Sequence, residues 1–212
     1  MTKTKFYIMH YKKNAERLRR LKPILDKLGI EAEWYTEYDK DELTPEDISR
    51  YYTPDIDLFK ERTAGMYEEV DYDGTTMGHL SLCIKHLKCM EDLASSEYDN
   101  GVFLEDDVVF HYGKSALIDC IEMAEEISWD GLFFGGGFTH SLIADRIYGA
   151  YKNLILVDHP ATNCTSSFAL TRGAAKKILS SFNTVCTSID WELNHHFRFK
   201  NLAYETLCLR SA

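Results

Sequence analysis

Residues 101–110, Gly101-Val102-Phe103-Leu104-Glu105-Asp106-Asp107-Val108-Val109-Phe110, form an apolar run that is interrupted by three adjacent carboxylates. The apolar half predicts a buried strand that carries the acids to the edge of a sheet. Adjacent carboxylates repel one another and lose solvation on burial, so a hard divalent cation commonly neutralises them. A solvated acidic turn is the alternative. The position at the carboxyl end of a strand, where α/β sheets bind ligands, favours the metal site.

The amino-terminal residues predict a strand, a helix and a second strand. Apolar runs at 5–10 and 30–35 lie on either side of a segment with helical spacing of leucines. Asn14 suits the start of this helix and Gly29 its end. Pro23 lies inside the pattern and predicts a kink or a division, because proline removes a backbone hydrogen bond.

The rest of the chain continues this alternation. Further helices are expected at 77–93, 115–127, 171–179 and 188–200, and further strands at 131–134, 154–157, 166–170 and 202–207. Residues 37–74 are acidic and rich in tyrosine, and we expect an irregular excursion that contains short helices, one of which begins at Thr44-Pro45-Glu46-Asp47. The sequence therefore predicts one α/β domain over 1–212, with a Rossmann-like central mixed sheet flanked by helices.

Charge narrows the possible partners of this domain. The formal net charge is −10, which argues against a nucleic-acid-binding protein, because such a protein needs a basic surface. The charge is uneven: residues 1–28 contain nine Lys or Arg and two acids, whereas residues 31–73 contain four Lys or Arg and fifteen acids. The basic amino-terminal helix could offer cations to a diphosphate. A solvated helix face is the alternative.

Cysteines and hydropathy indicate where the protein resides. The six cysteines, at positions 83, 89, 120, 164, 186 and 208, have no zinc-like or Cys-x-x-Cys spacing and suit reduced, mostly buried thiols. The chain shows neither a signal peptide nor a run of membrane-spanning length. We expect a cytoplasmic protein without a transmembrane segment, with peripheral membrane association or a domain cut from a longer chain as alternatives.

Four groups of residues occur in an order typical of one enzyme family. They are Gly78 and His86 in a predicted helix, Phe103-Leu104-Glu105-Asp106-Asp107-Val108, Thr171-Arg172-Gly173-Ala174, and Ile189-Asp190. On these residues the chain resembles glycosyltransferase family 25, which includes bacterial lipooligosaccharide galactosyltransferases and collagen hydroxylysine galactosyltransferases. The resemblance extends from the first strand to Asp190.

The chain departs from the family pattern in two places. Residues 8–13 with Arg17 resemble the family's first helix region, but its Asn-Leu-Asp portion is absent. The family's Gly-Glu-x-Gly-Cys-x-x-Ser-His pattern falls on residues 78–86. There this chain has His79, Ser81, Leu82 and Lys85 at the differing positions.

The resemblance implies a GT-A type fold and transfer of a hexose from a nucleotide sugar with inversion, assisted by Mn²⁺ or Mg²⁺. A metal held by Asp107 together with Glu105 or Asp106 would bridge the two phosphates of UDP and offset the charge that develops as the diphosphate leaves. We prefer the pair Glu105 and Asp107 because alternation along a strand points both side chains to the same side. Asp106 is then expected to contact the donor.

Inversion requires a base that takes the proton from the acceptor hydroxyl. The candidates are Asp190 and Glu192, and Asp190 matches the family position before the last helix. We expect backbone amides at the helix N-terminus to keep Asp190 ionised. A simple helix cap is the alternative.

The other donor-binding candidates lie in the first loop and in the helix at 77–93. Tyr11 could stack on the base or a sugar, Lys12 and Arg17 could bind the diphosphate, and His86 could touch the donor. For His86 the alternative is an ordinary histidine. Gly135-Gly136-Gly137 could let the backbone approach a sugar or metal, or simply form a turn.

These observations predict a metal-dependent hexosyltransferase that moves galactose or glucose from a UDP-sugar to a glycan, a lipid-linked sugar or a hydroxylysine-type protein side chain. Specificity is expected in the irregular segments 37–74 and 139–150. Because the sequence ends soon after Asp190, a carboxy-terminal segment that completes the acceptor site could be missing. The alternative function is a non-catalytic GT-A domain that binds a nucleotide sugar or a glycan, or serves as an assembly partner.

Overall fold

The computed structural model describes most of the chain. The described residues are 2–63, 74–110, 113–134, 147–152, 154–157, 164–182, 184–199 and 206–209. The triple glycine at 135–137 and part of the last predicted strand lie outside these ranges.

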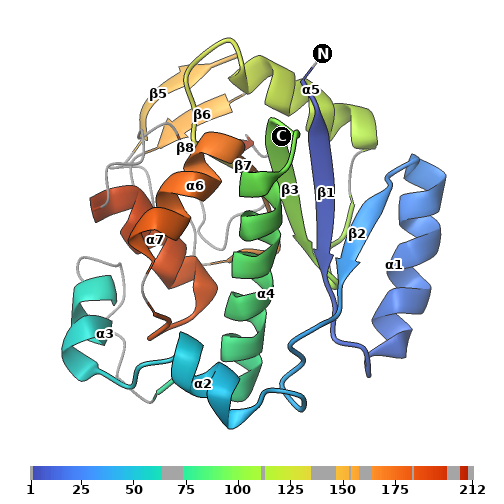
Figure 1. Ribbon diagram of the computed structural model, residues 1–212. Coiled ribbons are helices and arrows are strands. Elements are labelled where there is room, and N and C mark those ends of the chain that lie inside the picture. Colours follow the sequence, from blue (N-terminus) through green and yellow to red (C-terminus); the bar gives the residue numbers. More distant parts are fainter. Residues whose placement is uncertain are drawn as a thin grey trace.

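One sheet of eight strands organises the described residues (Figure 1). The strands are β1 (Thr4–Met9), β2 (Ala32–Tyr35), β3 (Asn100–Glu105), β4 (Gly131–Phe133), β5 (Ile147–Tyr151), β6 (Leu154–Val157), β7 (Ser167–Thr171) and β8 (Thr206–Leu209). Their spatial order is β2-β1-β3-β7-β4-β8-β6-β5. β1 is parallel to both β2 and β3, whereas β7 is antiparallel to β3 and β4, so the sheet is mixed.

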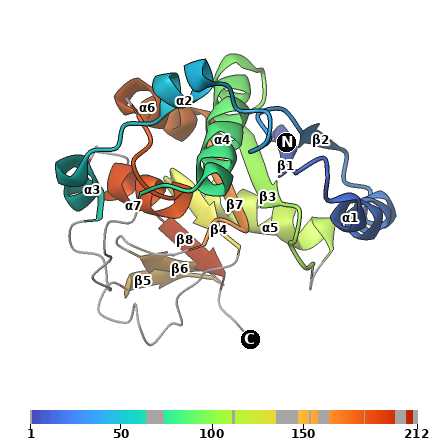
Figure 2. The same ribbon diagram turned by 90° about the horizontal axis from the view of Figure 1, so that it is seen from below.

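Helices cover both faces of this sheet. They are α1 (Ala15–Leu28), α2 (Pro45–Tyr51), α3 (Ile56–Thr63), α4 (Met77–Ser95), α5 (Lys114–Ala124), α6 (Arg172–Ser181) and α7 (Ile189–Phe199). Buried side chains of α4, α6 and α7 form one core cluster with the sheet, and those of α1 and α5 form a second cluster on the other face (Figure 2). The predicted fold class, a Rossmann-like central mixed sheet flanked by helices, is confirmed.

Alternation along the strands explains the two clusters. On β3, Phe103 belongs to the α4 side, and its neighbours Val102 and Leu104 belong to the α1 side. Tyr7 and Ile8 divide in the same way on β1. Successive side chains of a strand point to opposite faces, so a central strand covered on both faces is apolar throughout. The first polar side chains after these strands therefore mark the edge of the sheet.

The helix signals agree with the structure except at Pro23. Asn14 caps α1 by accepting from the backbone N–H of Arg17, and Gly29 ends it with a left-handed φ of 64°. α1 nevertheless runs through Pro23 without a break, so of the kink or division that we expected, the division does not occur. Pro23 is exposed, which lets water satisfy the carbonyl that loses its partner.

The segment 37–74 contains the short helices α2 and α3, as expected, whereas the segment 139–150 contains part of a strand. Thr44 and Asp47 form a reciprocal capping box at the start of α2, as the Thr-Pro-Glu-Asp motif predicts. β5 lies partly inside the segment 139–150, where no strand was expected.

Among the described helices, none has the length and apolar character that crossing a membrane requires. Cys83, Cys89, Cys120 and Cys186 are buried thiols, as expected.

Candidate functional site

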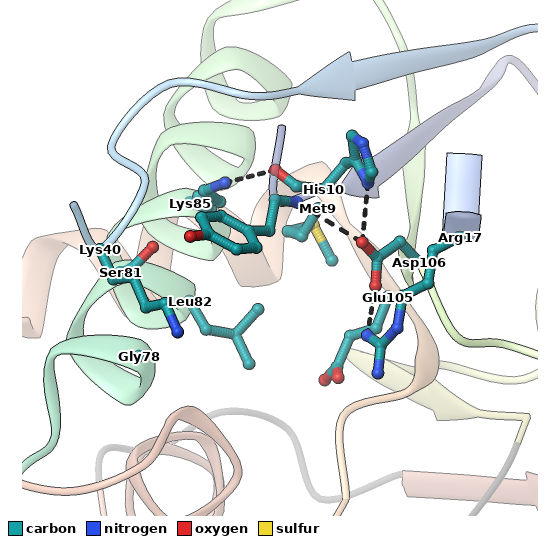
Figure 3. A pocket seen from close by; sticks show the side chains of 11 residues that line it. Met9, His10, Arg17, Lys40, Gly78, Ser81, Leu82, Lys85, Glu105 and Asp106 are labelled. Carbon is teal, nitrogen blue, oxygen red and sulfur yellow. Dashed lines mark hydrogen bonds and ion pairs between the residues drawn. The ribbon is translucent and has the colours of Figure 1, made fainter. Parts of the chain in front are cut away.

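A cavity of about 220 Å³ lies at the carboxyl ends of β1 and β3, beside the first turns of α4 (Figure 3). Its lining residues are Met9, His10, Tyr11, Arg17, Lys40, Gly78, Ser81, Leu82, Lys85, Glu105 and Asp106. β1 pairs with β2 on one side and with β3 on the other. Along the sheet, the chain continues from β1 to β2 on one side and from β3 to β4 on the other, so the strand order reverses between β1 and β3. Such a switch point opens a crevice in which α/β proteins bind ligands.

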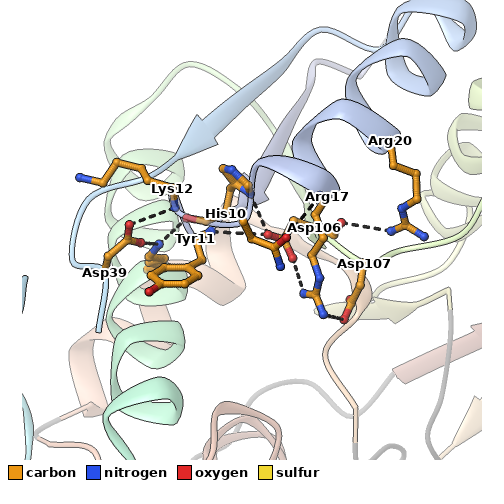
Figure 4. A network of polar contacts seen from close by, with 10 residues as sticks. His10, Tyr11, Lys12, Arg17, Arg20, Asp39, Asp106 and Asp107 are labelled. Carbon is orange, nitrogen blue, oxygen red and sulfur yellow. Dashed lines mark hydrogen bonds and ion pairs between the residues drawn. The ribbon is translucent and has the colours of Figure 1, made fainter. Parts of the chain in front are cut away.

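Asp106 holds the loop that follows β1 (Figure 4). Its side chain is buried and accepts hydrogen bonds from His10 Nδ1 at 2.7 Å, from the backbone N–H of Tyr11 at 3.4 Å and from Arg17 at 2.5 Å. Its backbone carbonyl accepts from Arg20 at 3.2 Å. These partners occupy both carboxylate oxygens. Asp106 lines the cavity, so the predicted donor contact stays a prediction, and its hydrogen bonds make it a positioning residue for the loop.

Arg17 joins the acidic segment to α1. One guanidinium nitrogen contacts Asp106, and another lies 3.0 Å from a carboxylate oxygen of Asp107. The hydrogen bond to Asp106 raises the pKa of Arg17, so the guanidinium stays charged. Arg17 lines the cavity, as a diphosphate-binding residue should.

Glu105 is the other carboxylate in the cavity lining. It is half-buried, and the Thr165 hydroxyl donates to it at 2.7 Å. Burial raises the pKa of Glu105, and the neighbouring negative charges of Asp107, Asp190 and Asp106 add to that effect. A bound cation would lower the pKa of Glu105 again, because it favours the charged carboxylate.

The reason for pairing Glu105 with Asp107 needs a correction, whereas the pair itself stays a prediction. β3 ends at Glu105, and residues 106–107 form a turn, so strand alternation does not extend to Asp107. Asp106, not Asp107, joins Glu105 in the cavity lining, and Asp107 is exposed. The two predicted ligands remain close enough for the charge of Asp107 to raise the pKa of Glu105.

The donor set fits a metal only together with oxygens from a ligand. In the part of the chain that the structure describes, no group of three His, Cys, Asp or Glu side chains could hold a metal ion. The oxygens of Asp106 are already used, which leaves Glu105 and Asp107. Mg²⁺-type ions are commonly bound by one or two carboxylates, substrate phosphates and water. Two carboxylates suit that arrangement.

Asp190 begins α7 near the same region. It is partly exposed, and the Ser188 hydroxyl donates to it at 2.5 Å. Burial raises the pKa of Asp190, and this effect outweighs the hydrogen bonds from Ser188 and the backbone amides. The backbone amides lower the pKa of Asp190, as we expected, but burial is the larger effect. The charges of Asp190 and Glu105 interact, and His79 in the first turn of α4 also acts on Asp190.

Glu192 was predicted as a second candidate base, and the structure contradicts this. Its side chain is fully buried, and it lies 2.6 Å from Arg62. Backbone N–H groups of Cys186 and Thr187 donate to it at 2.8 and 3.2 Å. A carboxylate enclosed in this way cannot reach an acceptor hydroxyl. Glu192 instead joins α7 to α3.

We predict that Glu192→Ala lowers the free energy of unfolding by about 3–5 kcal/mol, because it leaves the Arg62 guanidinium buried without its carboxylate. Urea denaturation of the native protein and the variant measures this loss. Glu97→Ala is the control, since Glu97 pairs with Lys3 on the surface, and we expect no measurable change for it. A Glu192 variant as stable as the native protein would contradict the structural role.

His86 also differs from its prediction. It is fully buried in α4 and stacks on Phe168 and Phe103, with ring centroids 5.5 and 6.3 Å away. Burial lowers the pKa of His86 to about 3, so the ring stays neutral at physiological pH. The cavity lining does not include it. His86 is a core residue, because its helical position places it on the buried face of α4.

The two remaining predictions concern the loop after β1. Tyr11 lines the cavity; its hydroxyl donates to Asp41 at 2.5 Å, and Lys40 lies 5.1 Å above its ring. The exposed Lys12 side chain pairs with Glu42 at 2.6 Å and is not in the lining. The structure therefore brings Tyr11 to the site but not the Lys12 ammonium.

Three residues of the site were missed from the sequence: His10, Asp39 and Lys85. All three are buried, and two of them line the cavity. A signal existed for Lys85, because a lysine on the apolar face of a predicted helix requires a partner. Nothing in the pattern indicated Asp39, which lies in the acidic segment after β2.

Comparisons with known proteins add little. No protein-family model and no curated protein matches this chain. Among solved structures, the chain is similar to a CMP:2-keto-3-deoxy-manno-octonic acid synthetase complexed with CTP, with 11% sequence identity and a TM-score of 0.49. The alignment covers 100% of this chain and 90% of the other. This likeness is too distant to support a functional conclusion.

Proposed function

We propose that this protein is an inverting glycosyltransferase that moves galactose or glucose from a UDP-sugar to an acceptor hydroxyl. One observation carries the proposal. The cavity at the switch point between β1 and β3 combines the Arg17 cation with the Glu105 carboxylate, and Asp190 lies close enough to interact with Glu105. These are the groups that binding a diphosphate and accepting a proton require. The resemblance to glycosyltransferase family 25 supports the same function.

The cavity offers surfaces for both parts of a nucleotide. Met9, Leu82 and the ring of Tyr11 provide apolar area for a base and ribose. Arg17 supplies a planar guanidinium, which suits phosphate oxygens. Diphosphate oxygens that bind Arg17 would compete with Asp107 for its outer nitrogen, while Asp106 keeps the other nitrogen in place.

Glu105 and Asp107 would hold the divalent cation, Mn²⁺ or Mg²⁺. When bound, the ion supplies positive charge against the diphosphate leaving group. The raised pKa of Glu105 shows that this carboxylate is poorly compensated by the protein alone. Thr165 fixes its orientation through one oxygen.

Asp190 would act as the base that takes the proton from the acceptor hydroxyl. A raised pKa makes a carboxylate a stronger base, and the pKa of Asp190 is raised by burial. Ser188 orients one of its oxygens. The acceptor is a glycan, a lipid-linked sugar or a hydroxylysine-type side chain, and specificity would come from the segments 37–74 and 139–150.

A second candidate is a non-catalytic domain that binds a nucleotide sugar or a glycan, or serves as an assembly partner. The contacts of Arg17 with Asp106 and Asp107 favour it, because the acidic segment is already partly neutralised without a metal. Turnover separates the two candidates, since only the enzyme releases UDP.

The test is release of UDP from UDP-galactose and UDP-glucose, with and without Mn²⁺, by the native protein, Asp107→Ala and the control Glu97→Ala. We expect metal-dependent release from one of the two sugars, a loss of at least about tenfold in Asp107→Ala and none in Glu97→Ala. Nucleotide binding without release under any condition would favour the non-catalytic domain. A protein that neither binds nor cleaves the two sugars would reject the enzyme and the nucleotide-sugar-binding domain, and would leave only a domain that binds a glycan or serves as an assembly partner.

A further inference from the structure

A buried ion pair forms the α4 side of the cavity. Lys85 in α4 and Asp39 in the loop after β2 each have side chains that are only 3% exposed. The Lys85 ammonium donates to the backbone carbonyl of His10 (Figure 3). It also donates to a carboxylate oxygen of Asp39. The pair therefore joins α4 to the ends of β1 and β2.

Stability alone does not explain this pair. Removing two charges from water costs several kcal/mol per ion, and apolar residues of similar size are often as stabilising. An ammonium group has three N–H donors, and the contacts with Asp39 and His10 account for two. Lys85 also belongs to the cavity lining. Within the part of the chain that the structure describes, one donor of this buried cation is thus left over in a residue that lines the cavity.

The surroundings keep Lys85 in this position. The second oxygen of Asp39 accepts from the backbone N–H of Lys12 at 3.0 Å. One turn earlier in α4, the Ser81 hydroxyl donates to the carbonyl of Tyr38 at 2.7 Å. These contacts join the loop after β2 both to α4 and to the loop after β1. The Lys85 ammonium is therefore preorganised and does not have to be ordered when a ligand enters.

We propose that Lys85 is a nucleotide-binding residue, whose remaining ammonium N–H donates to an oxygen acceptor of the bound nucleotide. The proposal rests on the proposed function. Lys85 holds the α4 side of the cavity, while Arg17 holds the β3 side through its contacts with Asp106 and Asp107. These two cations, together with Lys40 in the same lining, suit a ligand that is rich in oxygens.

The acceptor oxygen could belong to the diphosphate or to the base and ribose. UDP and uridine distinguish these sources, because uridine lacks the phosphates. Loss of affinity for both ligands assigns Lys85 to the nucleoside, and loss for UDP alone assigns it to the diphosphate.

Lys85→Met alone would leave Asp39 charged and buried, and the protein could fail to fold. The test variant is therefore Lys85→Met combined with Asp39→Asn, which removes both charges and keeps an oxygen for the Lys12 N–H. The matched control is Lys177→Met with Asp130→Asn, a Lys–Asp pair at 3.2 Å between α6 and the residue before β4. It lies outside the cavity lining.

The measurement is the Kd for UDP and for uridine by calorimetry, together with the thermal midpoint of each protein. We expect the Lys85 double variant to stay folded and to bind UDP about tenfold or more weakly, while the control pair binds like the native protein. Native-like UDP affinity in the Lys85 variant would overturn the inference and leave the proposed function intact. A native protein that does not bind UDP would overturn both.

Discussion

Asp190→Asn should lower the rate of hexose transfer by about 10²–10⁴-fold, the usual contribution of a general base, while the protein stays folded. Asparagine keeps an oxygen that can accept from Ser188, but it cannot take a proton. Burial raises the pKa of Asp190, so its charged form is disfavoured in the folded state. Removing that charge should therefore leave the free energy of unfolding at neutral pH unchanged or higher. Initial rates and urea denaturation of the same two proteins measure both effects.

The pH dependence of the native enzyme provides an independent check. A base is active when deprotonated, so the rate should fall as the pH decreases through the pKa of Asp190. Because that pKa is raised above 3.8, the acidic limb should lie above the pH at which an ordinary aspartate titrates. If Asp190 were only a helix cap, Asp190→Asn would retain the native rate and the same acidic limb.

Asp106→Ala should have the largest effect on stability within the site, a loss of about 3–5 kcal/mol in the free energy of unfolding. The variant removes the acceptor for His10, the Tyr11 N–H and Arg17 together. His10 would then be buried without the partner of its Nδ1, and Arg17 would lose its anchor. UDP binding should weaken as well, because the loop after β1 is no longer fixed. Denaturation and calorimetry measure the two effects.

Asp107→Ala is the matched control for this prediction. Asp107 is the next residue along the chain, but its side chain is 45% exposed, and among the described residues it pairs with the outer nitrogen of Arg17 alone. Its loss should cost less than about 1 kcal/mol of stability and should reduce the metal-dependent rate. We therefore expect Asp106→Ala to lower mainly the stability and Asp107→Ala to lower mainly the metal-dependent rate. Equal stability losses in the two variants would contradict the assignment.

The elements of the fold follow closely from hydrophobic periodicity. The helix at 77–93 and the strand before the acids were placed within a few residues of α4 and β3, because both are apolar over most of their length. Local signals such as Asn14 and Thr44 also act as expected, since a cap depends on neighbouring residues only. β5 was missed within a segment whose sequence shows no clear period.

The site was harder to predict because its contacts join residues far apart in the sequence. Glu192 and Asp190 are both acids in the first turn of α7, and only the contact with Arg62, 130 positions away, separates their roles. Similarly, strand alternation favoured Glu105 with Asp107, but it could not show that β3 ends at Glu105. Asp39 and Lys85 come into contact only when the loop after β2 packs on α4, which the local sequence does not indicate.

The most direct test of the central claim is a crystal structure of the protein with UDP and Mn²⁺. We predict density for the nucleotide in the cavity at the ends of β1 and β3, with the base beside Tyr11, phosphate oxygens at Arg17 and the ion between the diphosphate and Glu105. Asp106 should keep its contacts with His10 and the loop. Nucleotide density elsewhere on the protein, with this cavity empty, would contradict the account.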